Sequence, residues 1–166
     1  RDRASKAAAA AGCRHLRLER PGWREAPGDR WQRVDDLPAA LRALAGLGVG
    51  RVFAALGARA VPALAGSSIT FVVRGIEPPP ALPANVTWLA GRGPFMPEGE
   101  RALLAEHRID AVLCRDSGGE GARAKLDAAR QLGLPVVLIE RPPHARGEAV
   151  ADVTAAVAVV DRLVSG

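Results

Sequence analysis

The hydrophobic residues of the chain are grouped in short runs that predict buried strands. Each run is continuous rather than alternating, which is typical of strands covered on both faces. Glycine or proline flanks several runs, as expected where a strand ends in a turn. Five such runs occur, at residues 52–56, 70–74, 86–89, 109–114 and 135–139. Two further strands are predicted upstream, at 13–21, where apolar and charged residues alternate as at a sheet edge, and at 31–34.

Amphipathic segments around these runs predict helices. Asp35 and Asp36 can cap a helix in which Leu37, Leu41 and Leu44 recur about one turn apart. Further helices are predicted at residues 1–11, 97–107, 120–132 and 153–164.

The alternation of buried strands with helices predicts an α/β fold, a doubly wound and mostly parallel Rossmann-like sheet with helices on both faces. The chain begins inside helix-forming sequence with no strand before it. We therefore expect two halves, of which the first is truncated. Residues 1–47 would be the remnant of a first Rossmann-like domain with its crossover, and residues 48–166 a second Rossmann-like domain.

The composition excludes some classes of protein but only slightly limits the kinds of partner that the chain could bind. Of the 166 residues 48% are hydrophobic and 25% are charged, which excludes a disordered tail or a fibrous protein. No apolar run approaches the roughly 20 residues of a membrane span, so no membrane partner is expected. The net charge of +5 favours anionic partners, although genomic base composition also explains a chain rich in arginine. Basic residues are scattered and tyrosine is absent, so no nucleic-acid partner is expected.

Cysteine and histidine positions argue against disulfide and metal chemistry. Cys13 and Cys114 lie about a hundred residues apart, which favours a reducing compartment and a cytoplasmic location. Cys114 closes a predicted buried strand and is expected to be a small core residue. His15, His107 and His144 lack metal-ligand spacing, so they are interpreted as surface or capping residues and no metal site is predicted. Neither a serine nucleophile elbow nor a close carboxylate pair occurs, which leaves hydrolase functions unsupported.

Arginine lies in or beside the loop that follows each of the five core strands. The carboxyl ends of parallel strands meet at one edge of a sheet, where ligands of open α/β sheets bind. Guanidinium groups that converge there would form a receptor for phosphate or carboxylate. The alternative is that one or two of them only lie on the rim. The five residues are Arg59, Arg74, Arg92, Arg115 and Arg141.

The most specific segment joins the strand that ends near residue 114 to the helix predicted at 120–132. Its sequence is Arg115-Asp116-Ser117-Gly118-Gly119-Glu120. Small residues here would let backbone amides approach a phosphate or carboxylate at the start of the helix. The competing interpretation is a tight turn in which Ser117 caps the helix. Lys125, in the helix that follows, either reaches the same anion or is an ordinary solvated lysine.

Several loop motifs, in this order, resemble the carboxyl-terminal part of the precorrin-6A reductase family. The resemblance covers nearly all of residues 4–142, and the motifs occur at matching intervals. They lie at residues 16–21, 28–31, 51–57, 71–79, 91–95, 117–119, 124–129, 134–137 and 141–142.

This resemblance implies an enzyme of cobalamin biosynthesis in which NADPH reduces a double bond of the macrocycle precorrin-6A or its cobalt form. It also implies two Rossmann-like halves with cofactor and substrate in the cleft between them. The acetate and propionate groups of such a substrate would give the arginine-lined edge a partner. The strand-end loops and the resemblance together give as cofactor- or substrate-binding candidates Gly57, Arg59, Arg74, Arg92, Gly93, Arg115, Asp116, Ser117, Gly118, Gly119, Lys125 and Arg141.

The chain departs from the family pattern in two loops. Gly57-Ala58-Arg59 stands where the family has Gly-Arg-Gln, and Arg115-Asp116 stands where the family has Lys-Asn before Ser-Gly-Gly. The family's Gly-Gly-Thr loop would lie upstream of Arg1, so we expect the chain by itself to be inactive. The alternative function is a non-catalytic α/β domain that binds a phosphate- or carboxylate-bearing metabolite. No catalytic residue is singled out, Ser117, Asp116 and water all stay open as the proton donor, and no motif indicates an oligomeric state.

Overall fold

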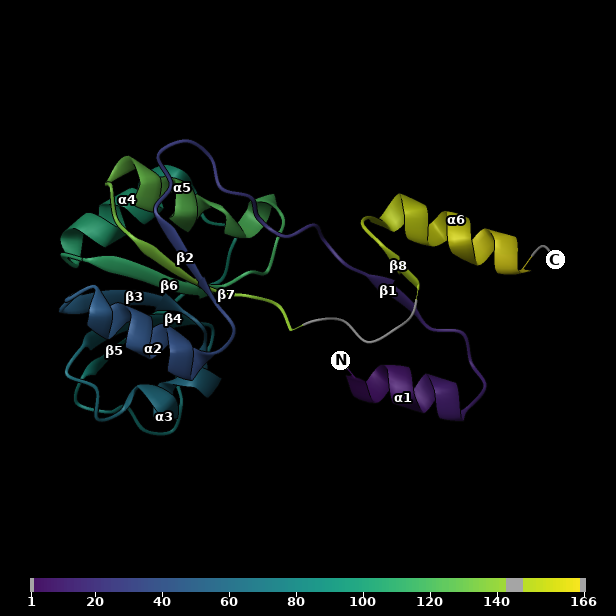
Figure 1. Ribbon diagram of the computed structural model, residues 1–166, viewed down its shortest axis with the longest axis horizontal. Coiled ribbons are helices and arrows are strands. Elements are labelled where there is room, and N and C mark those ends of the chain that lie inside the picture. The colour runs from purple at the N-terminus through teal and green to yellow at the C-terminus, as the bar shows by residue number, and fades with distance from the viewer. Residues whose placement is uncertain (1, 143–147, 165–166) are drawn as a thin grey trace. The chain divides into compact units, whose positions relative to one another are not determined.

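The computed structural model describes all residues except Arg1, 143–147, 165 and 166, so His144 lies outside the described residues. The chain forms two compact units (Figure 1). One unit is Trp23–Arg141, and the other combines Arg1–Gly22 with Pro142–Gly166.

The unit Trp23–Arg141 contains a six-stranded sheet in which every pair of neighbouring strands is parallel. The order across the sheet is β2-β7-β6-β3-β4-β5. The bounds are β2 Trp31–Val34, β3 Arg51–Ala55, β4 Thr70–Gly75, β5 Val86–Ala90, β6 Ala111–Arg115 and β7 Val136–Ile139. The predicted α/β fold with a mostly parallel sheet is confirmed, and each predicted core run forms a strand.

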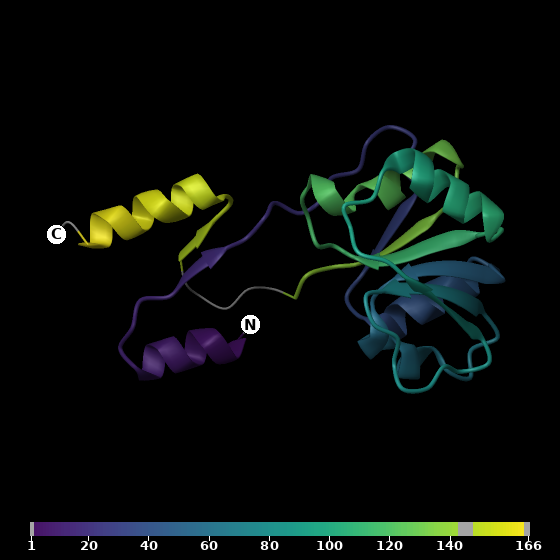
Figure 2. The ribbon, with the colours of Figure 1, turned by 180° about the vertical axis from the view of Figure 1, so that it is seen from behind.

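Helices cover both faces of this sheet (Figures 1 and 2). On one face lie α2 and α3, and on the other lie α4 and α5, which pack against each other. Their bounds are α2 Leu37–Gly46, α3 Val61–Leu64, α4 Pro97–Glu106 and α5 Ala124–Gln131, and single 3₁₀ turns, η1 Ala58–Ala60 and η2 Glu120–Ala122, precede α3 and α5. The helix predicted at 120–132 is therefore divided and shorter, and the short helix after β3 was not predicted.

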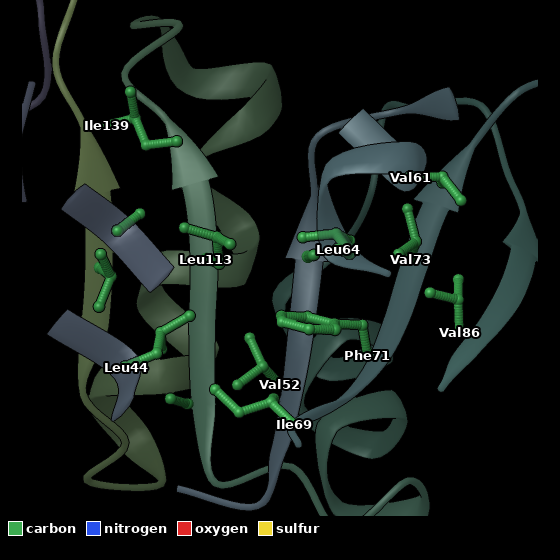
Figure 3. Close-up of a cluster of buried hydrophobic side chains, with 14 residues drawn as sticks. Leu44, Val52, Val61, Leu64, Ile69, Phe71, Val73, Val86, Leu113 and Ile139 are labelled. Carbon is green, nitrogen blue, oxygen red and sulfur yellow. The ribbon is translucent and has the colours of Figure 1, made fainter. Parts of the chain in front are cut away.

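The core consists of two clusters, one on each face of the sheet. Neighbouring strand residues alternate between them: Val52 belongs to the cluster with Leu44 of α2, whereas Phe53 belongs to the cluster with Leu104 of α4. Figure 3 shows the first cluster, in which Phe71 lies near the middle. Strands buried on both faces explain why their sequences are continuous apolar runs.

Helix α2 begins as predicted from its acidic cap. The Asp36 carboxylate accepts a hydrogen bond of 2.7 Å from the backbone N–H of Ala39, and Pro38 occupies the first turn, where its missing N–H costs nothing.

The second unit contains α1 Asp2–Ala10, β1 Leu16–Leu18, β8 Glu148–Val150 and α6 Val153–Val164. β1 and β8 form a parallel two-stranded sheet. Helix α6 has the predicted bounds, whereas β8 was not predicted and β1 is shorter than the predicted strand at 13–21.

The two compact units do not coincide with the predicted boundary between residues 47 and 48. β2 and α2 belong to the larger unit because β2 pairs with β7 and α2 packs on the same strand. Pro142 and the described residues from Glu148 onward belong to the smaller unit, where β8 pairs with β1.

Candidate functional site

The carboxyl ends of the central strands lie side by side and carry most of the predicted residues. Ala55 of β3 is in register with Cys114 of β6, and Gly75 of β4 is in register with Ala90 of β5. A pocket of about 410 Å³ opens at this edge. Its lining residues lie at the ends of β3, β4 and β6, in the loops after β3, β5 and β6, or in η2 and α5. They are Ala55, Gly57, Arg74, Gly75, Gly91, Gly93, Phe95, Arg115, Ser117, Gly121, Ala122 and Lys125. We call this the strand-end pocket.

Half of the predicted residues line the strand-end pocket. These are Gly57, Arg74, Gly93, Arg115, Ser117 and Lys125, whereas Arg59, Arg92, Asp116, Gly118, Gly119 and Arg141 are not among its lining residues. Arg59 and Arg92 are exposed. The five arginines predicted to converge are therefore divided, and only Arg74 and Arg115 reach this pocket.

Arg74 is buried, and its charge is matched inside the protein. Its guanidinium makes a bidentate ion pair with the Glu100 carboxylate from α4, in which Nη2 lies 2.9 Å from Oε2. The guanidinium carbon also lies 3.5 Å from the centroid of the Phe95 ring and 4.9 Å from that of Phe53. Arg74 thus holds Phe95 as one wall of the pocket rather than presenting a free cation.

Neither Phe95 nor Glu100 was singled out in the sequence. Phe95 belongs to the loop motif at 91–95, which was the available signal for it. Glu100 pairs with Arg74 across 26 residues, a separation that no local pattern reveals.

Asp116 organises the loop behind the pocket. Its Oδ1 accepts hydrogen bonds from the backbone N–H groups of Trp23, at 3.2 Å, and Gly118, at 3.1 Å. Guanidinium groups of Arg33 and Arg141 lie 3.7 and 3.6 Å from its carboxylate oxygens. Arg141 also donates from Nε to the backbone carbonyl of Asp116 at 2.7 Å. Two residues predicted to bind cofactor or substrate, Asp116 and Arg141, are therefore engaged with each other.

The two glycines after Ser117 adopt backbone conformations that other residues rarely take. Gly118 has φ 62° and Gly119 has φ 75° with ψ 160°. The Gly119 carbonyl accepts a hydrogen bond of 2.8 Å from the Trp23 indole N–H. Ser117 is exposed, and neither η2 nor α5 has a side-chain cap, so the interpretation of Ser117 as a helix cap is wrong.

Lys125 is buried in the first turn of α5, with 6% of its surface exposed, so the interpretation as a solvated lysine is wrong. Its Nζ donates a hydrogen bond to the Ala122 carbonyl and lies 4.7 Å from the centroid of the Trp23 ring. Burial lowers the pKa of the ammonium; Arg74 lowers it further, while Cys114 and Glu100 act in the opposite direction. Among the residues that the structure describes, no carboxylate forms an ion pair with Lys125.

The exposed cation of the pocket is Arg115, at the end of β6. It forms no ion pair with any described residue. Because Arg115, Lys125 and several glycines line it, the pocket suits a phosphate or carboxylate group.

A second pocket, of about 400 Å³, lies on the α4 side of Phe95. It shares Arg74, Gly91 and Phe95 with the strand-end pocket and is otherwise lined mainly by apolar residues such as Leu89 and Leu103. Phe95 therefore contributes to two neighbouring pockets.

The described histidines His15 and His107 and the thiol of Cys114 each have a local structural setting. His15 shares a hydrogen bond of 3.2 Å with Ser5, His107 ends α4, and Cys114 is fully buried, as predicted for a core residue. Within the described residues, no group of three or more His, Cys, Asp or Glu side chains could hold a metal ion. None of the described helices has the length and apolar character needed to cross a bilayer.

Comparison with known proteins gives consistent results. A family model described as "Precorrin-6x reductase CbiJ/CobK" matches residues 1–161. Similar curated proteins include the precorrin-6A reductase of Rhodococcus erythropolis, 44% identical over 88% of this chain and 60% of its own length, and that of Mycobacterium tuberculosis, 41% identical over 85% and 57%. A solved CobK precorrin-6A reductase superposes with a TM-score of 0.90 at 34% identity, over 96% of this chain and 66% of its own.

The chain spans about 60% of the length of the curated relatives that it matches. The match extends through both compact units, because the family model covers residues on either side of the boundary at Gly22 and at Arg141. On this evidence of sequence and fold, the chain belongs to the precorrin-6x reductase family.

Proposed function

We propose that the protein containing this chain reduces a double bond of precorrin-6A, or of its cobalt form, in cobalamin biosynthesis. The observation that carries the proposal is the strand-end pocket, with Arg115 and Lys125 beside it, in a chain of this family. Precorrin-6A reductase is the name of the relatives at 44% and 41% identity. NADPH, when bound, would supply the hydride.

The geometry of the pocket supports an anionic ligand. Gly118 and Gly119 set the path of the loop after β6, whose Ser117 lines the pocket, and Arg115 at the end of β6 forms no ion pair with a described residue. These groups would hold a phosphate of NADPH or a carboxylate of the macrocycle. Phe95, fixed by Arg74, would offer a flat apolar surface to the nicotinamide or to the macrocycle.

The chain's own contribution to the reaction would be orientation and exclusion of water. The rigid Asp116 loop and the Arg74–Glu100 pair fix the pocket walls before any ligand binds. We expect residues 1–166 alone to be inactive, since they span about 60% of the length of the relatives.

The smaller unit belongs, in this proposal, to the first Rossmann-like half. Support comes from its two-stranded sheet, which is marginal in isolation, and from α6, where large apolar side chains are exposed. The exposed residues are Val153, Val157, Val160, Leu163 and Val164. Replacing Val157 and Val160 by serine should lower the melting temperature of the full coding sequence's product more than that of residues 1–166, and equal effects would contradict this assignment.

The test of function uses the protein made from the full coding sequence that contains this chain. Binding of NADPH is followed by quenching of its fluorescence, and turnover by its oxidation when precorrin-6A is added. We expect both, with NADH oxidised more slowly. Cobalt-precorrin-6A in a parallel assay distinguishes the two forms of the substrate.

Two outcomes would contradict the proposal. A protein that neither binds NADPH nor oxidises it in the presence of either macrocycle is not this reductase. Binding of an anionic metabolite without any turnover would instead support the non-catalytic alternative.

For the cellular location, we propose the cytoplasm, because Cys13 and Cys114 are both free thiols, as a reducing compartment would maintain them.

A further inference from the structure

Reduction of a conjugated double bond needs a proton as well as a hydride. The hydride forms a new C–H bond at one end of the double bond and leaves an electron pair at the other end of the conjugated system. A general acid that delivers a proton to that second atom accelerates such a step by about 100-fold to 10,000-fold. The strand-end pocket can therefore be searched for a group able to release a proton.

Most polar groups at the pocket cannot take this role. Arginine does not deprotonate in proteins, so neither Arg115 nor Arg74 can be the proton donor. Arg74 is in addition paired with Glu100. The Ser117 hydroxyl is a very weak acid. Asp116 already accepts two backbone hydrogen bonds, lies beside two guanidinium groups and does not line the pocket.

Lys125 differs from these groups in position and in partners. Its side chain is buried and lines the pocket, and its Nζ is held by the Ala122 carbonyl and the face of Trp23. Trp23 is itself fixed at both ends, by Asp116 and by the Gly119 carbonyl. An ammonium has three N–H groups, so it can donate to a ligand in the pocket while it keeps the bond to Ala122.

The location of Lys125 is unfavourable for a lysine with a merely structural role. The first turn of a helix carries partial positive charge, which repels a cation. Burial without a carboxylate partner adds a desolvation cost. Both effects make the ammonium a better acid than an exposed lysine, and the pKa of Lys125 is indeed lowered, chiefly by burial.

We propose that Lys125 is the proton donor of the reduction, a role that rests on the function proposed above. The Nζ–H bond breaks as the proton joins the substrate atom that receives the electron pair, and the neutral amine then takes a proton from water. Per double bond, the reaction consumes one hydride from the nicotinamide donor and one proton, and it releases the oxidised cofactor and the dihydro product.

The charged and titratable groups around Lys125 set the pH range of this step. They are Cys114 on β6, Arg74 on β4 and Glu100 on α4, and Arg115 on β6 lines the same pocket. A general acid is lost as its proton dissociates, so kcat should fall as the pH rises through the pKa of Lys125, below the ordinary lysine value of 10.5.

The experiment compares Lys125→Met and Lys125→Arg in the protein made from the full coding sequence. Methionine has a similar shape but no proton to give, whereas arginine keeps the charge but does not release its proton. Both variants should lose about 100-fold or more in kcat, lose the alkaline limb of the pH profile and still quench NADPH fluorescence. Lys6→Met, at an exposed residue of α1 and the only other lysine, is the matched control and should behave as wild type.

The stability of the Lys125→Met variant shows whether Lys125 acts as a proton donor or only supports the structure. Removal of a buried unpaired cation should leave Lys125→Met at least as stable as wild type in urea unfolding at pH 7, although it is inactive. Lower stability together with lost activity would overturn the proposal in favour of a structural role.

Turnover separates a proton donor from an anion anchor. A Lys125→Arg variant with wild-type kcat and pH profile, or a Lys125→Met variant that changes only KM, would show that the lysine merely anchors an anion. An inactive wild-type protein would overturn the proposed function instead, so the two failures are distinguishable.

Discussion

Arg74 and Glu100 form a bidentate ion pair inside the larger unit, between strand β4 and helix α4. Both side chains are almost completely buried, so each charge depends on the other for its stabilisation. The pair also fixes Phe95 against the Arg74 guanidinium, at the wall between two pockets.

We predict that Glu100→Gln destabilises the protein by about 3 kcal/mol, because it leaves a buried guanidinium without its counter-charge. Urea unfolding measures this loss. Glu98→Gln is the matched control, since Glu98 lies in the same helical turn but is exposed, and it should change stability by less than about 0.5 kcal/mol. Equal effects of the two substitutions would show that the Arg74–Glu100 pair contributes nothing specific.

The sequence was sufficient to predict the sheet but not the contacts that shape the site. The strands β3, β4, β6 and β7 are buried on both faces, and that environment requires a continuous apolar run that can be recognised locally. β8 has only three residues and depends on pairing with β1, more than a hundred residues away, so no local pattern marks it.

At the site, too, residues marked by local sequence could be predicted, whereas contacts between residues far apart in the chain could not. Glycines and Arg115 at strand ends could be placed because the topology brings these ends together. Asp116 pairs with Trp23 across 93 residues, and Lys125 is buried although its residue type and helical position predict exposure. Contacts of this kind depend on the packing of the whole unit, which explains why Arg141 was expected at the ligand and instead lies against Asp116.

The loop after Ser117 should tolerate no side chain at Gly119. Its φ of 75° and ψ of 160° fall in a region that essentially only glycine adopts, so Gly119→Ala should lower the free energy of unfolding by about 1 to 3 kcal/mol.

Gly99→Ala should have the opposite effect and stabilise the protein. Gly99 lies within helix α4, and a methyl group there would meet no heavy atom within 4 Å, so we expect a gain of about 0.5 to 1 kcal/mol. Unfolding in urea measures both, and a Gly119→Ala protein as stable as wild type would refute the strained geometry.

The buried thiol of Cys114 should make the protein less stable in alkaline solution. Burial raises its pKa from 9.0 to about 11, while nearby Lys125 opposes the shift and Asp116 adds to it. Below pH 9 the thiol is protonated in both the folded and the unfolded chain. Between about pH 9 and 11 the unfolded chain loses this proton and the folded chain keeps it, so the free energy of unfolding falls as the pH rises.

The size of this effect follows from the shift. Each pKa unit corresponds to about 1.4 kcal/mol, so a shift of about two units gives a total of about 3 kcal/mol, of which wild type should lose about 2 kcal/mol between pH 9 and 11 from the thiol alone. The Cys114→Ala variant lacks the titrating thiol, so its free energy of unfolding should fall less than that of wild type over the same pH range. The smaller side chain also lowers the stability of the variant by an amount that does not depend on pH. Urea unfolding at several pH values measures the difference between the two proteins, and parallel pH profiles would exclude the thiol as the cause.

Arg115 and Arg59 were predicted to act together at the strand ends, but only Arg115 lines the strand-end pocket. A guanidinium bound to a phosphate or carboxylate typically contributes about 1.5 to 3 kcal/mol, so Arg115→Gln should weaken the binding of NADPH or of precorrin-6A by about 10-fold to 100-fold. Arg59→Gln removes an identical charge from an exposed side chain of η1 and should alter neither affinity by more than about twofold. Titration of both ligands at fixed ionic strength measures the contrast. If the two substitutions weaken binding equally, the pocket lined by Arg115 is not where the anion is held. Such a result would favour binding of the anion by several arginines that converge at the ends of the strands.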